Sequence, residues 1–269
     1  MNKIRKKAAK LGFTLIELSI VLVIIGLIVG GILVGQDLIK AAEIRATVSQ
    51  MEKYSTAVNT FRGKYNGIPG DLLNASNFGF DSVRGINNGN SVIESMSADS
   101  GSFAGEASCF WDDLSYAGMI SDSLNSSSVA CGTSQSSTLS QSIPAAKMGR
   151  SNYLVVGSNA GINYWSITGV SSLAAGLYTT TSSLTAAEAF QIDSKVDDGA
   201  GTSGGTLAVD SSTAVGATQI SGRALFITTN NGGGTTTAGC IQSATAGLYN
   251  FTYNNGNAQA CQLRLRSSF

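Results

Sequence analysis

The sequence predicts an α+β protein, in which one long N-terminal helix packs on a C-terminal domain with an antiparallel sheet and long loops. A mostly apolar run from Phe13 to Val34 continues into apolar residues spaced by three and four up to Tyr65, which is typical of one long helix. Alternating runs bounded by turn residues, which begin at Asn152, indicate strands. Gly, Ser, Thr, Asn and Ala dominate the later chain, a composition that suits long loops.

Composition limits the function classes that the chain can serve. The 269 residues leave room for one sizeable domain or two small ones. No His is present, which excludes Ser-His-Asp catalysis, the common zinc sites and His general bases. Five of the 17 basic residues lie before residue 11, which leaves 12 basic against 17 acidic residues and predicts no specific nucleic-acid binding. We therefore expect no enzyme; a hydrolase that uses carboxylates alone is the catalytic alternative.

The N-terminal stretch combines a basic leader with a span long enough to cross a bilayer. The leader has no acidic residue, and its charge would hold the N-terminus in the cytoplasm. Phe13 to Val34 would form a helix about 33 Å long. Glu17 is a carboxylate near one end of this span, where an ionisable group needs a partner. The basic residues of the leader are Lys3, Arg5, Lys6, Lys7 and Lys10.

Two other interpretations compete for this stretch. A secretory signal peptide would have a shorter apolar core and a small-residue cleavage site, of which Ala41-Ala42 is a poor version. An ordinary single-span anchor explains the hydrophobicity but neither Glu17 nor the Gly12–Phe13 junction. Two pairs of glycines four residues apart, 26 with 30 and 31 with 35, would let neighbouring helices approach closely in lipid.

Residues 1 to about 45 resemble the N-terminus of type IV pilins and type II secretion pseudopilins, through the leader, the Gly12–Phe13 junction, Glu17 and the apolar run. The resemblance implies that a prepilin peptidase cuts after Gly12 and methylates Phe13. It also implies that Glu17 neutralises the amine of a neighbouring subunit in a filament. Many filament pilins have a helix-breaking proline in this helix, whereas this chain has none from 13 to 67.

Together with the resemblance, which implies that the leader at 1–12 is cleaved, these patterns predict a long helix at 13–65 whose span is about 13–34, and an extracytoplasmic head at 66–269. The second half of the helix is predicted to lay one apolar stripe on the head. That stripe consists of Ile44, Val48, Met51, Tyr54, Val58, Phe61 and Tyr65.

The head is predicted as loops, short helices and strands. The segment 64–71 turns the chain off the long helix, and residues 110–120 form a short amphipathic helix. Thr185 and Glu188 form a capping box that opens a helix up to Asp198. The predicted strands are 152–156 and 162–168, which form a hairpin, and 206–209, 223–229, 248–253 and 261–265.

The four cysteines are Cys109, Cys131, Cys240 and Cys261, and none forms a CxxC pair. Three connectivities are possible in an oxidising compartment, and four free buried thiols are the alternative. We favour Cys109–Cys131 and Cys240–Cys261, because each pair closes a local loop. The second pair also resembles the disulfide-bounded C-terminal region of many type IV pilins.

Asp193, Asp197 and Asp198 oppose the dipole of the helix that they are predicted to end. Lys195 or a bound calcium ion would compensate their charge, and some pilins and pseudopilins hold calcium near their C-terminal loops. The spacing differs from that of an EF-hand, so an acidic helix end without metal is the alternative. No other cofactor is expected. The acids at 112–113 are expected to start a helix.

The function expected from this resemblance is a structural prepilin, processed after Gly12 and assembled through its N-terminal helix. Its expected partners are the prepilin peptidase, an inner-membrane assembly platform, identical or related pilin subunits, and membrane lipid before assembly. The expected location is the bacterial inner membrane, as a single pass with a cytoplasmic N-terminus, and then an extracytoplasmic or cell-surface filament. A pseudopilin of type II secretion is one alternative. An adhesive or ligand-binding minor pilin is another, which rests on polar loops and on aromatics expected to be exposed, such as Tyr164 and Trp165.

Overall fold

The computed structural model describes residues 13–80, 87–94, 105–124, 138–159, 161–174, 177–181, 183–196, 209–210, 224–228, 249, 251 and 259–269. The chain divides into an N-terminal unit, Met1–Ala42, and a head unit, Glu43–Phe269. The division falls inside helix α1 (Leu15–Tyr65). The head unit combines the predicted head at 66–269 with the second half of α1, because that half packs into its core.

The predicted long helix is confirmed, since α1 runs over 51 residues without a proline. It ends where Asn66 adopts the left-handed conformation, with φ of 55°, while its amide still donates to the carbonyl of Arg62 at 2.9 Å. Gly or Asn in this conformation is a common helix end. Pro69 follows, and because it has no amide hydrogen and a fixed φ, the chain leaves the helix here.

The second half of α1 buries one face in the core of the head unit, as its spacing predicts. The buried side chains are Ile44, Thr47, Gln50, Met51, Tyr54, Ala57, Val58 and Phe61. The Gln50 side chain accepts from the amide of Lys147 at 3.0 Å and donates to the carbonyl of Ala145 at 3.0 Å. Thr47 Oγ1 accepts from the amide of Met148 at 3.0 Å. These polar side chains therefore satisfy the backbone of an irregular segment that has been brought against the helix.

The sheet of the head unit is mainly antiparallel, with strand order β1-β2-β7-β6-β5; β3 pairs with β2, and β4 with β7. The predicted hairpin is confirmed by β1 and β2, and β7 lies antiparallel between β2 and β6. One pair, β5 with β6, is parallel. Of the predicted strand at 248–253 the structure describes only residues 249 and 251. The strands are β1 (Asn152–Asn159), β2 (Ile162–Ala174), β3 (Leu177–Thr181), β4 (Leu184–Thr185), β5 (Val209–Asp210), β6 (Ala224–Thr228) and β7 (Gln259–Arg266).

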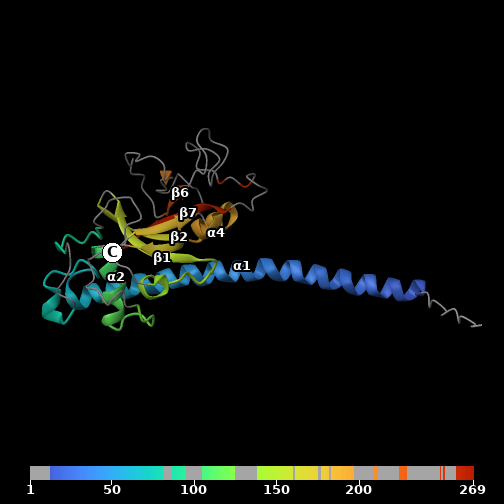
Figure 1. Ribbon diagram of the computed structural model, residues 1–269, viewed down its shortest axis with the longest axis horizontal. Helices are drawn as coiled ribbons and strands as arrows, with labels where there is room; N and C mark the ends of the chain where they lie inside the picture. The colour runs from blue at the N-terminus through green and yellow to red at the C-terminus, as the bar shows by residue number, and fades with distance from the viewer. Residues whose placement is uncertain are drawn as a thin grey trace, which may run out of the picture. The chain divides into compact units, whose positions relative to one another are not determined.

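One face of the sheet packs against the second half of α1 (Figure 1). Trp165 on β2 lies opposite Val156 on β1 and opposite Leu265 on β7, so that the three buried side chains share this face. The Trp165 ring lies 6.3 Å from the Tyr54 ring, and its Nε1 donates to Ser55 Oγ at 3.1 Å. The contact joins the inner strand β2 to α1.

The expectation that Trp165 is an exposed aromatic is wrong. Only 2% of its surface is exposed, because alternation along β2 places it on the covered face of the sheet. Tyr164, the preceding residue, is half-buried. The rings that pack against Trp165 are those of Tyr54, Phe110, Trp111 and Phe269. A residue of the core had therefore been predicted to be part of a binding surface.

The short helices of the head unit are α2 (Glu106–Tyr116), α3 (Leu139–Ser142), α4 (Ala186–Val196) and the 3₁₀ turn η1 (Ala75–Phe78). Helix α2 begins four residues before the predicted start at 110, and Asp113 therefore lies inside it rather than at its start. Asp113 is buried, and its Oδ2 accepts from the amide of Gly70 at 2.7 Å. It therefore fastens the turn after α1 to α2.

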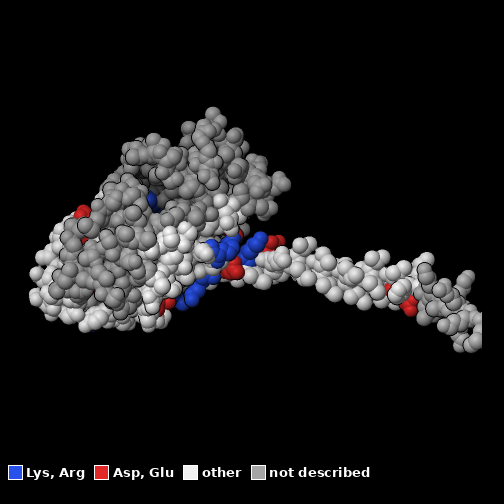
Figure 2. All heavy atoms as spheres, in the orientation of Figure 1, with Lys and Arg blue, Asp and Glu red and all other residues white. Residues whose placement is uncertain are grey.

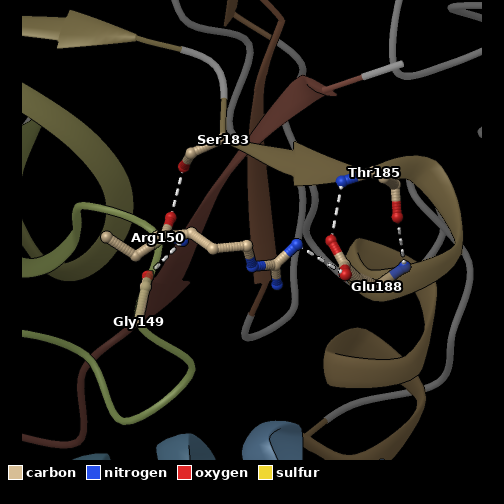
Figure 3. A network of polar contacts seen from close by, with 6 residues as sticks. Gly149, Arg150, Ser183, Thr185 and Glu188 are labelled. Carbon is tan, nitrogen blue, oxygen red and sulfur yellow. Dashed lines mark hydrogen bonds and ion pairs between the residues drawn. The ribbon is translucent and has the colours of Figure 1, made fainter. Parts of the chain in front are cut away.

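The predicted capping box at the start of α4 is confirmed (Figure 3). The amide of Thr185 donates to Glu188 Oε2 at 3.0 Å, and the amide of Glu188 donates to Thr185 Oγ1 at 3.3 Å. The other carboxylate oxygen of Glu188 pairs with Arg150 at 2.8 Å. Arg150 lies in a turn whose residues Gly149, Arg150 and Ser151 have φ of 68°, 55° and 56°. The ion pair therefore connects this left-handed turn before β1 to α4.

Candidate functional site

Helix α1 begins with a hydrogen-bonded cap built from Thr14 and Glu17. Glu17 Oε2 accepts from the Thr14 amide at 2.7 Å and from the Thr14 hydroxyl at 2.8 Å. The Glu17 amide donates to Thr14 Oγ1 at 3.3 Å. This reciprocal pairing is a capping box, and it holds the carboxylate at the beginning of α1. Glu17 was predicted as a site residue but Thr14 was not, although a Thr with a Glu three residues later is the sequence signal for such a box.

The first part of α1 exposes apolar side chains around its whole circumference. Every residue from Phe13 to Val34 is exposed, with Phe13 at 83%. Glu17 is the only charged residue between Phe13 and Gln36, and Figure 2 shows this length of helix as largely uncharged. By length and composition, α1 could cross a membrane. Such a surface is favourable only against lipid or against other apolar helices.

Four glycines leave notches in this apolar surface. A Cβ added at Gly26, Gly30, Gly31 or Gly35 would meet no other atom within 4 Å. The spacing of four residues places Gly26 below Gly30 and Gly31 below Gly35 on the helix. A neighbouring helix could therefore approach the backbone closely along these two lines.

Glu17 has no cation within reach on its own helix. The next basic residue along α1 is Lys40, about 35 Å further on at 1.5 Å per residue. Moving the carboxylate out of water costs several kcal/mol unless a positive group meets it. The capping box satisfies hydrogen bonds but does not neutralise the charge. If this end of α1 is buried in apolar packing, the compensating cation has to come from outside α1.

The cysteines are only partly covered by the described residues. Cys109 in α2 and Cys261 in β7 are fully buried and disulfide-bonded. Cys131 and Cys240 lie outside the described residues. The pairing Cys109–Cys131 and Cys240–Cys261 therefore stays a prediction.

The three acids predicted to hold calcium are also only partly described. Asp193 lies inside α4 with no exposed surface, and its Oδ2 accepts from the Tyr249 hydroxyl at 2.9 Å. Asp197 and Asp198 lie outside the described residues. Within the described ranges no group of three His, Cys, Asp or Glu residues could hold a metal ion. Calcium at these acids stays a prediction.

Comparison with known proteins concerns the N-terminal stretch alone. A family model described as the prokaryotic N-terminal methylation motif matches residues 7–33. The match includes Phe13 and Glu17, and also Gly12, which precedes the first described residue. No curated protein and no solved structure matches the chain.

Proposed function

We propose that this chain, whose residues 7–33 carry the N-terminal signature of type IV pilins and pseudopilins, is a structural subunit of a type IV pilus or pilus-like filament. A prepilin peptidase would cut between Gly12 and Phe13 and methylate Phe13. The first part of α1 would then carry the subunit from the membrane into the filament. The observation that supports this most is the helix surface itself, which is apolar and exposed on all sides with one carboxylate at its start.

The chemistry of assembly follows from two charges that need each other. Cleavage after Gly12 creates an amine on Phe13, which is largely protonated at neutral pH. Packed among apolar helices, this ammonium and the Glu17 carboxylate would each cost several kcal/mol if left alone. Pairing the amine of one subunit with Glu17 of its neighbour removes both costs and fixes the axial position of the two helices. Glu17 would thus set the axial register between neighbouring subunits.

Membrane insertion comes before assembly in this sequence of events. The span at about 13–34 would lie in the inner membrane as a single pass, with the leader in the cytoplasm and the head outside it. The partners are then the prepilin peptidase, an inner-membrane assembly platform, membrane lipid, and identical or related pilin subunits. The signature is that of structural subunits and not of enzymes.

A pilin is favoured over a type II secretion pseudopilin by the large head with long loops and by the cysteines near its C-terminal end. The proposed pairs Cys109–Cys131 and Cys240–Cys261 would close two loops of that head. The alternative of an adhesive minor pilin loses one of its supporting observations, because Trp165 belongs to the core and is not an exposed aromatic.

Shearing of cells tests the filament role. We expect the wild-type chain in the sheared fraction at the mass of a chain that starts at Phe13. Gly12→Val places a bulky side chain at the bond to be cut, so this variant should stay in the membrane fraction with its leader attached. Gly63→Ala is a matched control, because a Cβ there meets no atom within 4 Å and should leave the result unchanged.

Recovery of Gly12→Val in sheared filaments would contradict cleavage-dependent assembly. Wild-type chain that is processed but confined to membranes would instead support the pseudopilin alternative.

A further inference from the structure

Asp71 is a buried carboxylate that binds the backbone of a separate segment of the head unit. It has 1% of its surface exposed and lies in the turn that follows α1. Its Oδ1 accepts from the amide of Gly89 at 2.7 Å, and its Oδ2 accepts from the amide of Ser91 at 2.7 Å. Both oxygens of Asp71 are therefore committed to holding the segment 87–94.

Glu106 is a second buried carboxyl group, at the first residue of α2, and it also has 1% of its surface exposed. Its Oε2 accepts from the amide of Glu94 at 2.6 Å. Its Oε1 is buried and receives no hydrogen bond from a described donor. Asp71 lies close to Glu106, because a Cβ added at the adjacent Gly70 would lie 2.3 Å from the Glu106 carbonyl oxygen, and hydrogen bonding between the two carboxyl groups contributes to a raised pKa of Glu106. Two ionised carboxylates can only accept hydrogen bonds, so a bond between Glu106 and Asp71 requires a proton.

Among the described residues, no positively charged side chain compensates the buried carboxyl groups of Asp71 and Glu106. Asp71 and Glu94 are the titratable groups that act on Glu106, and in the described ranges none of the three forms an ion pair with Lys or Arg. Those ranges also contain no group of three acids that could hold a metal ion. Burial raises the pKa of Glu106 to about 9, and the charges of Asp71 and Glu94 add to this rise, against the opposing effect of the Glu94 amide.

We propose that Asp71 and Glu106 share one proton, and that this proton fastens the turn after α1, the segment 87–94 and the start of α2 together, so that the head unit loosens as the pH rises. The pair is a proton-dependent latch inside the head. Its importance in the cell rests on the proposed function, because an extracytoplasmic head meets the pH of the surroundings. The latch itself does not depend on filament assembly.

The direction of the pH effect follows from the pKa of Glu106. It is an acid whose pKa rises from 4.5 in its ordinary environment to about 9 in the folded chain. Between these values the folded state binds more protons than the unfolded state. The stabilisation is therefore complete below pH 4.5 and is lost progressively up to about pH 9. The loss is up to about tenfold in the folding equilibrium constant per pH unit.

Glu106→Gln tests the latch, because the amide of Gln imitates the protonated acid: it can donate to Asp71 while its oxygen accepts from the Glu94 amide. The measurement is urea unfolding of the full chain in detergent at pH 5, 7 and 9. The chain has two tryptophans, Trp111 and Trp165, both buried in the head unit, so their fluorescence reports on the head. Glu52→Gln removes the same charge from an exposed position and serves as control.

We expect the urea midpoint of wild type to fall from pH 5 to pH 9, and that of Glu106→Gln to stay nearly constant and to exceed wild type at pH 9. Glu52→Gln should follow wild type. Equal pH dependence in wild type and Glu106→Gln would overturn the inference. So would restoration of the wild-type midpoint at pH 9 by calcium alone, since a cation and not a proton would then join the carboxylates. If Glu106→Gln does not fold, the urea midpoint of wild type at the three pH values tests the inference alone. A midpoint that stays constant or rises with pH contradicts the latch.

Discussion

Glu17→Ala is expected to abolish filament assembly while cleavage after Gly12 continues. The variant leaves the amine of a neighbouring Phe13 without a counter-charge inside apolar packing, which costs about 3–5 kcal/mol. We expect the amount of subunit in the sheared fraction to fall about tenfold or more. The membrane fraction should still contain the processed chain. Immunoblotting of both fractions measures the two quantities separately.

Two further variants separate charge pairing from helix capping. Glu17→Gln keeps an oxygen that can accept from the Thr14 amide but removes the charge, and it should fail like Glu17→Ala. Thr14→Ala removes the hydroxyl of the capping box, at about 1 kcal/mol, but keeps the Glu17 charge, so it should still assemble. Normal filament yield from Glu17→Ala, or an equal loss of filament in all three variants, would contradict the charge-pairing role of Glu17.

Gly70→Ala is expected to destabilise the head unit by about 3–5 kcal/mol. Gly70 has φ of +85°, and a Cβ there would lie 2.3 Å from the carbonyl oxygen of Glu106. The obstacle is backbone at the start of α2, which cannot rotate away as a side chain could. Relief would require the turn to move, and this would weaken the 2.7 Å bond from the Gly70 amide to Asp113. Urea unfolding followed by tryptophan fluorescence measures the loss.

Gly118→Ala is the matched control for this prediction. Gly118 also has a positive φ, +67°, but a Cβ added there meets nothing within 4 Å. Its cost should be the conformational strain alone, about 1 kcal/mol. The comparison isolates the clash from the strain. Similar losses at the two positions would show that the contact with α2 does not restrict Gly70.

The features predicted from the sequence are those that local patterns encode. The periodicity that ends near Tyr65, the hairpin that begins at Asn152 and the Thr185–Glu188 capping box each depend on residues close in the chain. The hydrophobic spacing also identified the face of α1 that is buried. Local patterns did not give the start of α2 or the short strands β3 and β4.

Buried polar side chains were the main features that the sequence left undetected. Asn163 on β2 shows why, because its Oδ1 accepts from the amide of Ile93 at 2.8 Å and its Nδ2 donates to the carbonyl of Ser91 at 2.9 Å. These partners lie about 70 residues away, and an Asn in a strand gives no sign of them. Gln50 and Asp71 have the same kind of distant partner. Trp165 was misplaced for a related reason, since only the packing of the sheet decides which face is covered.

The candidate site could be proposed from the sequence because its chemistry is local. Gly12, Phe13 and Glu17 lie within six positions of the chain, and their spacing carries the resemblance. Thr14 could have been found from the same stretch. The partner of the Glu17 carboxylate could not, because no cation lies near it on α1 and the proposed partner belongs to another subunit.

Mass spectrometry of the N-terminal peptide tests the central claim most directly, since every later step depends on processing. The peptide would be isolated from membrane and sheared fractions of cells that express the full chain. We predict a peptide that begins at Phe13 and carries one additional methyl group. An intact leader beginning at Met1, or a new N-terminus near Ala42, would contradict the filament role and leave an anchored or secreted domain.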